Sequence, residues 1–156
     1  MSRPPLALDA ACPCRADADV TYGACCGRFH RAPDLGASAL TDPRELVRAR
    51  FSAFALGLLP FVRETESSDR PRIEALDPRT RYKRLELLDA DLDPAAPRVL
   101  FAVDVLSRGA DVSFVELSSF GIERGRLVYL TGITGRKKAG ERLAPLTIAD
   151  FEARIR

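Results

Sequence analysis

All four cysteines and the single histidine of this 156-residue chain lie in one short segment, CPCRADADVTYGACCGRFH, residues 12–30. Cys12 and Cys14 form a C-x-C pair, and the adjacent pair Cys25 and Cys26 follows after ten intervening residues. Each pair can donate two thiolates from one turn of backbone, and tetrahedral zinc takes four such ligands. The segment therefore predicts a small zinc site, in which the metal supplies folding energy that so few apolar residues cannot supply.

The residues next to the cysteines fit this interpretation, and they also leave alternatives. Gly23 and Gly27 flank the second pair, where they would ease a sharp turn. A redox-active or disulfide pair is one alternative, although adjacent cysteines strain a disulfide and the C-x-x-C spacing is absent. Buried cysteines without a metal are another. His30 could replace Cys26 as the fourth ligand or hydrogen-bond to the site; we favour Cys26.

Composition excludes several classes of protein. A formal net charge of +2 does not predict a nucleic-acid-binding protein, so no nucleic-acid partner is required. The chain has no stretch near the ~20 apolar residues of a membrane span, and its N-terminus lacks a secretory signal. We therefore expect a cytoplasmic protein without membrane association. The cytosol keeps thiols reduced, which favours a metal site over disulfides.

The chain divides into four predicted parts. Residues 1–11 are a flexible lead-in, 12–30 the zinc motif, 31–41 a linker rich in Pro, Gly and Ala, and 42–156 the main domain. The C-terminal extension of that domain is basic, because residues 124–156 hold eight Lys or Arg and three Asp or Glu. We interpret this extension as a solvated basic surface rather than a polyanion site.

The main domain is predicted to begin with helices. Asp42 can cap a helix whose first position is Pro43. Apolar residues then recur at helical spacing, at Val47, Phe51, Phe54 and Leu58. Gly57 and Pro60 predict a break before a second short helix over 61–66, and one helical turn is expected near Ile73.

A run of consecutive strands follows. YKRLELLDADL predicts the first strand, and residues 98–133 predict three more, joined by SRGAD and by a turn at Arg124-Gly125. A closing helix begins after Thr147. Helices followed by an antiparallel meander predict an α+β fold in which the helices pack on one sheet.

The register proposed for the central hairpin assigns faces to the sheet. Pairing Leu106 with Val112 places Asp104 and Glu116 on one face, together with Ser118. The opposite face would be apolar, formed by Phe101, Val103, Val105, Val115 and Leu117. Asp104 and Glu116 are then the acid and base candidates of a hypothetical enzyme, although we interpret them as solvated carboxylates.

The pattern CPC…Y..CCG resembles the SEC-C motif, a small zinc-binding module found at the C-terminus of the bacterial translocation motor SecA. More closely, CPC…YGACCGRFH with ELVRARFSAFALG, YKRLELLDADL and VSFVELSSFGIERGRLVYLTG resembles the bacterial YchJ-like family. The resemblance covers roughly residues 12–133. It implies an α+β fold similar to nuclear transport factor 2 (NTF2), in which N-terminal helices pack on a curved antiparallel sheet to form a cone. The SEC-C motif would precede this domain in the sequence.

The same resemblance implies that Cys12, Cys14, Cys25 and Cys26 are the zinc ligands, and that Tyr22 packs across the small site. This chain departs from the family pattern in two places. RAD replaces the usual Gly-Ser-Gly after C-x-C in a loop two residues longer than usual, and TESSDRPR lacks the usual Trp and His.

Two classes of function follow. The first class is a non-enzymatic module, because four protein ligands leave zinc no open position for chemistry. By resemblance, this module would bind a protein or the ribosome, since the similar module of SecA contacts SecB and the ribosome. The alternative is a small-molecule carrier or an isomerase- or hydrolase-type enzyme that uses the cavity of the cone. That alternative requires a deep pocket with convergent polar groups, which Tyr82 and Tyr129 could line. A homodimer through the exposed sheet face is a further expectation.

Overall fold

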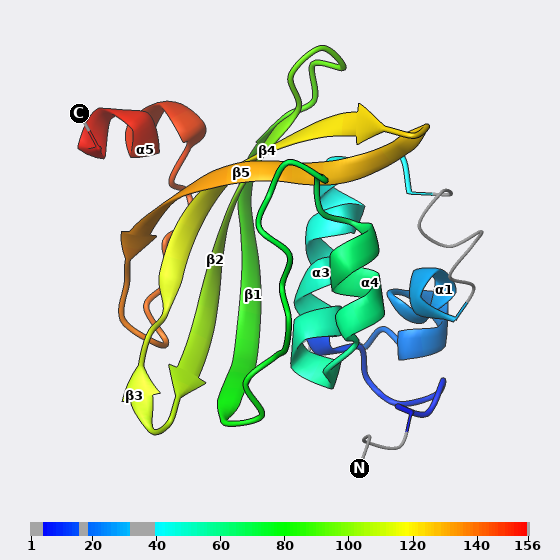
Figure 1. The fold of residues 1–156 in the computed structure, drawn as a ribbon. Coiled ribbons are helices and arrows are strands. Elements are labelled where there is room, and N and C mark those ends of the chain that lie inside the picture. The colour runs from blue at the N-terminus through cyan, green and yellow to red at the C-terminus, as the bar shows by residue number, and fades with distance from the viewer. Residues whose placement is uncertain (1–4, 16–18, 32–39, 156) are drawn as a thin grey trace.

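The computed structural model describes residues 5–15, 19–31 and 40–155. Its central element is a curved antiparallel sheet (Figure 1). The order of its long strands is β1-β2-β4-β5, with a short β3 beside β2. The strands are β1 (Thr80–Asp91), β2 (Arg98–Ser107), β3 (Ala110–Asp111), β4 (Phe114–Glu123) and β5 (Arg126–Arg136). All the pairings are antiparallel, as the predicted meander requires.

Two helices cover the concave face of the sheet, α3 (Pro43–Leu56) and α4 (Leu59–Glu64) (Figure 1). Helix α3 begins as predicted, because the Asp42 side chain accepts a hydrogen bond from the backbone N–H of Arg44. It ends at Gly57, whose φ of 74° is left-handed. Helix α4 lies two residues earlier than the predicted 61–66, and residues 71–77 form no helical turn.

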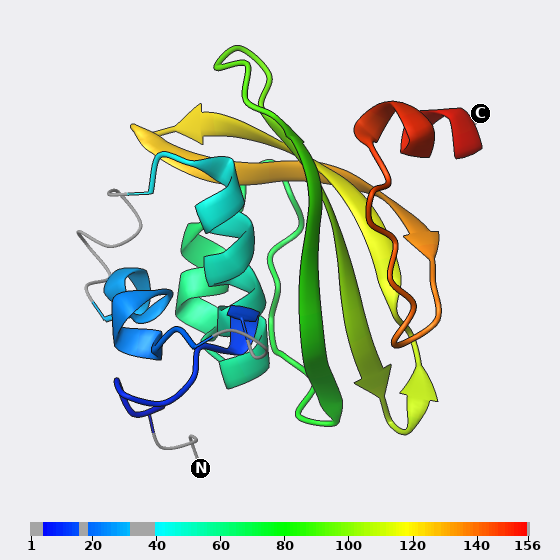
Figure 2. The ribbon, with the colours of Figure 1, turned by 180° about the vertical axis from the view of Figure 1, so that it is seen from behind.

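The cysteine segment packs against α3, and its residues 13–15 also contact strand β1 of the sheet (Figure 2). It is built from η1 (Pro13–Arg15), η2 (Tyr22–Ala24) and α1 (Gly27–His30). Residues 5–11 are hydrogen-bonded to it, since the N–H groups of Tyr22 and Gly23 reach the carbonyl groups of Ala10 and Leu8. Residues 1–4 of the predicted lead-in and 32–39 of the predicted linker lie outside the described residues, so the domain division stays a prediction.

The C-terminal extension covers part of the other face of the sheet. Helix α5 (Ile148–Arg154) starts with the predicted Thr147 cap, reinforced by Asp150. This face has its own apolar core, formed by Leu100, Ala102, Val115, Leu117, Leu146, Ile148 and Phe151. The face proposed for dimerisation thus carries a segment of the same chain, and the dimer stays a prediction.

The observed register of β2 and β4 differs by one residue from the predicted one. Phe101, not Ala102, pairs with Glu116. The turn between β2 and β3 consists of only Arg108 and Gly109, with φ values of 53° and 83°, and this two-residue turn sets the pairing. Since a shift of one residue reverses one strand's faces, Asp104 and Glu116 lie on opposite faces, and the predicted assignment is wrong.

None of the helices in the described ranges combines the length and the apolar character needed to cross a membrane.

Candidate metal centre and ligand cavity

The four cysteine sulfurs converge on one point. The Sγ of Cys14 lies 3.6 Å from that of Cys12, 3.5 Å from that of Cys25 and 3.6 Å from that of Cys26. The Sγ atoms of Cys25 and Cys26 are 4.0 Å apart, and all four lie within 4.8 Å of one another. A tetrahedron with zinc–sulfur bonds of about 2.3 Å has edges of about 3.8 Å. The donor set and its size therefore fit one tetrahedral metal ion.

Local backbone geometry brings the two pairs together. Cys14 lies in η1, whereas Cys25 follows η2 and Cys26 precedes α1. A Cβ at Gly27 would lie 2.7 Å from the carbonyl oxygen of Tyr22, so only glycine permits this close approach. The second cysteine pair thus depends on the glycine that follows it.

The cysteine cluster is buried rather than exposed to solvent. All four cysteines are at most 4% exposed. The hydroxyl of Ser52, on α3, donates a hydrogen bond of 3.2 Å to the Sγ of Cys26, and it lies 3.7 Å from the Sγ of Cys12. The sulfurs are therefore part of the contact between the motif and α3.

Charges around the sulfurs suit thiolate ligands. Although burial acts to lower it, the negative charges at Cys25 and Cys14 raise the pKa of Arg15. Hydrogen bonding from the Cys14 thiol lowers the pKa of Cys12 far below its usual range, whereas hydrogen bonding to Cys12 raises that of Cys26. Thiols must lose their protons to act as metal ligands, so a bound metal would displace those protons.

His30 is engaged elsewhere. Its Nε2 donates a hydrogen bond of 2.8 Å to the backbone carbonyl of Ala49, so its Nδ1 accepts one of 2.7 Å from the Tyr22 hydroxyl. Burial lowers the pKa of His30, which favours this neutral form. These hydrogen bonds occupy both ring nitrogens of His30, and they fasten the motif to α3.

The disulfide alternative receives no support. All four cysteines are free, and the shortest Sγ–Sγ distance, 3.5 Å, is far longer than a disulfide bond of about 2.05 Å.

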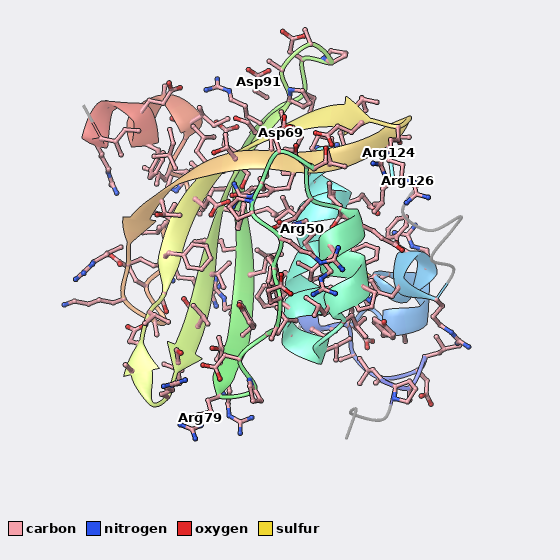
Figure 3. The ribbon with its side chains drawn as sticks, viewed as in Figure 1. Arg50, Asp69, Arg79, Asp91, Arg124 and Arg126 are labelled. Atoms are coloured by element: carbon pink, nitrogen blue, oxygen red, sulfur yellow. The ribbon has the colours of Figure 1, made fainter. Side chains whose placement is uncertain are left out.

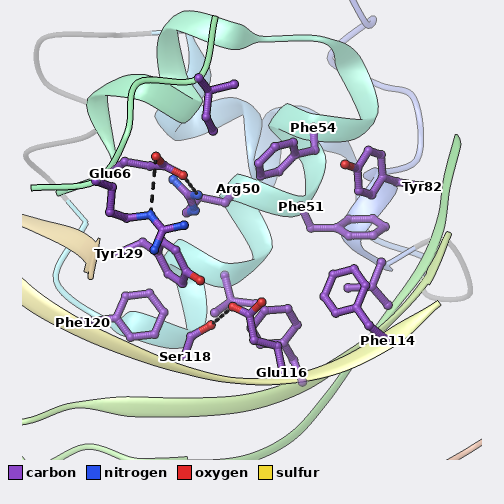
Figure 4. Close-up of a pocket in the computed structure, with 15 residues that line it drawn as sticks. Arg50, Phe51, Phe54, Glu66, Tyr82, Phe114, Glu116, Ser118, Phe120 and Tyr129 are labelled. Atoms are coloured by element: carbon purple, nitrogen blue, oxygen red, sulfur yellow. Dashed lines mark hydrogen bonds and ion pairs between the residues drawn. The ribbon is translucent and has the colours of Figure 1, made fainter. Parts of the chain in front are cut away.

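A cavity of about 270 Å³ lies between the helices and the concave face of the sheet (Figure 4). Seven of its fifteen lining residues are aromatic, and both predicted tyrosines are among them. The residues that line it are Val47, Arg50, Phe51, Phe54, Glu66, Arg70, Ile73, Tyr82, Phe101, Val103, Phe114, Glu116, Ser118, Phe120 and Tyr129.

One side of the cavity carries an arginine–glutamate cluster. Arg50, from α3, donates hydrogen bonds of 2.9 Å to Glu66 and 2.8 Å to the hydroxyl of Thr65. Arg70 lies 3.8 Å from the other carboxylate oxygen of Glu66. Both guanidinium groups also stack on Tyr129, at 4.9 Å and 4.7 Å from the ring centroid. This cluster was missed from the sequence, although an arginine at position 50 interrupts the apolar stripe of the predicted helix.

A second polar group lies on the sheet. Glu116 accepts a hydrogen bond from the Ser118 hydroxyl (Figure 4). Burial and the nearby Glu116 charge raise the pKa of Tyr129, so its hydroxyl stays protonated. A Cβ at Gly132 would lie 2.5 Å from the Glu116 carboxyl carbon and 2.6 Å from the Tyr129 hydroxyl. Gly132 thus leaves the space in which these side chains meet.

Asp104 does not join this group, so the predicted acid–base pair is wrong. On the opposite face of the sheet, it accepts hydrogen bonds from the Lys137 ammonium and the backbone N–H of Gly140. The Lys137 side chain is only 1% exposed, so this residue of the basic extension is not part of a solvated surface.

Known proteins share this combination of elements. A family model described as "YchJ, middle NTF2-like domain" matches residues 42–132. The chain belongs to the YchJ-like family. A UPF0225 protein of Corynebacterium efficiens is 35% identical over 133 residues, which cover 82% of this YchJ-like chain and 96% of that relative. A UPF0225 protein of Ralstonia nicotianae is 34% identical over 143 residues, with coverage of 83% and 94%.

Two solved structures have the same fold as the YchJ-like chain. One is the solution structure of a SEC-C motif-containing protein from Rhodopseudomonas palustris, with a TM-score of 0.64, 24% identity and coverage of 80% of this chain and 98% of that one. The other, a crystal structure of a SEC-C motif-containing protein from Psychrobacter arcticus, has a TM-score of 0.64, 19% identity and coverage of 83% and 85%. The predicted family, the α+β fold and the NTF2-like domain are confirmed.

Proposed function

We propose that Cys12, Cys14, Cys25 and Cys26 hold one zinc ion in a closed structural site. The convergence of four buried sulfurs at tetrahedral spacing supports this proposal. Four thiolates leave zinc no position for substrate, so its role is to stabilise the motif and fasten it to α3. We further propose that the protein is a non-enzymatic binding protein in which the rigid motif contacts a protein or ribosomal partner.

Because the sulfurs are buried, such a partner would contact the side chains around the site. Arg28 is half-exposed, pairs with Glu45 of α3 and lies over the Phe29 ring. Arg31 follows directly and is exposed. These cations favour an acidic surface on the partner.

Metal content of protein purified without added metal tests the zinc site. We expect one zinc per chain in the wild type and loss of that zinc in Cys26→Ser. Ser119→Ala, on β4 and away from the motif, is the matched control and should keep one zinc. Wild-type protein without metal, or with a different metal, would contradict the proposal.

The cavity favours a second function, the carriage of a small molecule. A hollow lined by aromatic side chains, with polar groups converging at one side, is the usual form of a ligand site. Titration with small aromatic compounds, followed by NMR, should perturb residues that line the cavity. Replacing Phe114 by Trp should block this binding by filling the space.

A further inference from the structure

We infer that the cavity binds a small aromatic carboxylate, with its ring among the aromatic side chains and its carboxylate on Arg70. This inference rests on the proposed carrier function and names the class of ligand. It requires that Arg70 has a free hydrogen-bond donor, that the opening of the cavity favours negative charge and that the interior does not.

Arg70 supplies the free donor. Its Nε is buried and has no hydrogen-bond partner among the described residues. Its nearest carboxylate, on Glu66, is 3.8 Å away and already accepts a hydrogen bond from Arg50. A buried N–H without an acceptor is unfavourable, and a ligand carboxylate would satisfy it. Stacking on Tyr129, and a hydrogen bond of 3.3 Å to the carbonyl of Leu130, hold the guanidinium in place.

The charged residues around Arg70 favour an anion at the opening of the cavity. Arg70, Glu66 and Ile73 also line an adjoining polar hollow of about 520 Å³. Five arginines and three glutamates line this hollow, and they include Arg124 and Arg126 at the β4–β5 turn (Figure 3). Since Glu66 is neutralised by Arg50, the excess charge at the opening is positive.

The interior favours an uncharged ring. Phe51, Phe114 and Tyr82 surround the part of the cavity away from the arginines (Figure 4). The carboxyl group of Glu116 lies on the sheet side and would disfavour an anion there. The ligand is thus oriented with its ring inward and its carboxylate outward. A volume of about 270 Å³ accommodates a ligand of one or two rings.

The test compares 2-naphthoate with its neutral analogue 2-naphthamide by calorimetry and NMR. The carboxylate should bind wild-type protein at least about tenfold more tightly than the amide, as expected for a charge-assisted hydrogen bond. Arg70→Gln should remove this difference. Arg79→Gln, which alters an exposed arginine far from the cavity, is the charge-matched control and should preserve it (Figure 3). Melting temperatures verify that each variant is folded.

The outcomes separate this inference from the carrier function. Equal affinity for the acid and the amide in the wild type would overturn the role of Arg70 and leave the carrier function standing. So would an acid preference that survives in Arg70→Gln. Binding of neither compound would contradict both, and chemical-shift changes away from the cavity would place the ligand elsewhere and overturn the inference.

Discussion

The hydroxyl group of Ser52 donates a hydrogen bond of 3.2 Å to the Sγ of Cys26, across 26 positions of sequence. Ser52 lies on α3, whose other side faces the cavity, so one helix joins the cysteine cluster to the cavity. The same helix supplies Arg50 and Phe51 to the cavity lining. A change at the cysteine cluster that moved α3 would therefore also change the shape of the cavity.

Ser52→Ala should weaken metal binding about tenfold, because groups that hydrogen-bond to metal ligands orient those ligands and tune their affinity. Competition with a coloured chelator measures the change. Ser119→Ala should bind the metal as the wild type does. Unchanged affinity in Ser52→Ala would show that α3 does not orient Cys26.

His30→Gln should keep one metal per chain but lower the free energy of unfolding by about 1–3 kcal/mol, because it disturbs the link between Tyr22 and Ala49. Metal analysis and urea unfolding of the same samples measure the two effects. Cys26→Ser provides the contrast, since it should lose the metal. A metal-free His30→Gln protein would make His30 a ligand.

Lys137→Met should lower the free energy of unfolding by about 2–3 kcal/mol, because it leaves the buried Asp104 carboxylate without its closest cation. Arg84, 3.6 Å from Asp104, limits the loss. Lys138→Met, at the exposed neighbouring position, should change the stability by less than about 0.5 kcal/mol. Equal effects of the two substitutions would show that the buried ion pair adds no stability.

The Asp104 ion pair should also give the stability a specific pH dependence. Although burial acts to raise it, hydrogen bonds from Lys137 and Gly140 lower the pKa of Asp104 below its unfolded value of about 3.9. A lowered carboxyl pKa stabilises the fold above the unfolded pKa, and this stability is lost as the pH falls through the folded pKa. Urea unfolding between pH 7 and pH 3 should therefore show a steeper loss below about pH 4 in the wild type than in Asp104→Asn. Parallel profiles would contradict this assignment.

Gly132→Ala should lower the free energy of unfolding by about 1–3 kcal/mol, because the added methyl group would overlap Glu116 and Tyr129. Gly135→Ala, also on β5, is the matched control. There a Cβ would be 3.4 Å from Val115 and 3.6 Å from Phe151, so little change is expected. Thermal unfolding measures both variants, and equal melting temperatures would show that the cavity wall moves freely.

Features encoded by neighbouring residues were predictable. The C-x-C and C-C pairs sit on short turns, so their spacing alone brought four sulfurs within reach of one another. Asp42, Gly57 and Thr147 act on the backbone within a few residues, and the helix ends lie where these residues predicted.

Features that depend on contacts between distant segments were not predictable. The two-residue turn at Arg108-Gly109 moved the strand pairing by one position and brought Glu116 into the cavity. Burial of Lys137 depends on the path of the C-terminal extension over the sheet, which its basic composition did not reveal. Arg50 was identifiable only as an exception in an apolar stripe, because its partner Glu66 approaches from the segment after α4.

By itself, the sequence determined the cysteine cluster, the helix ends at Asp42, Gly57 and Thr147 and the α+β class, because short-range backbone chemistry and periodicity encode them. Only the tertiary structure decided which carboxylates share a face, which cations are buried and whether the cone is hollow. Register and packing bring together residues far apart in the chain, and a shift of one position in a strand exchanges what lies inside with what lies outside.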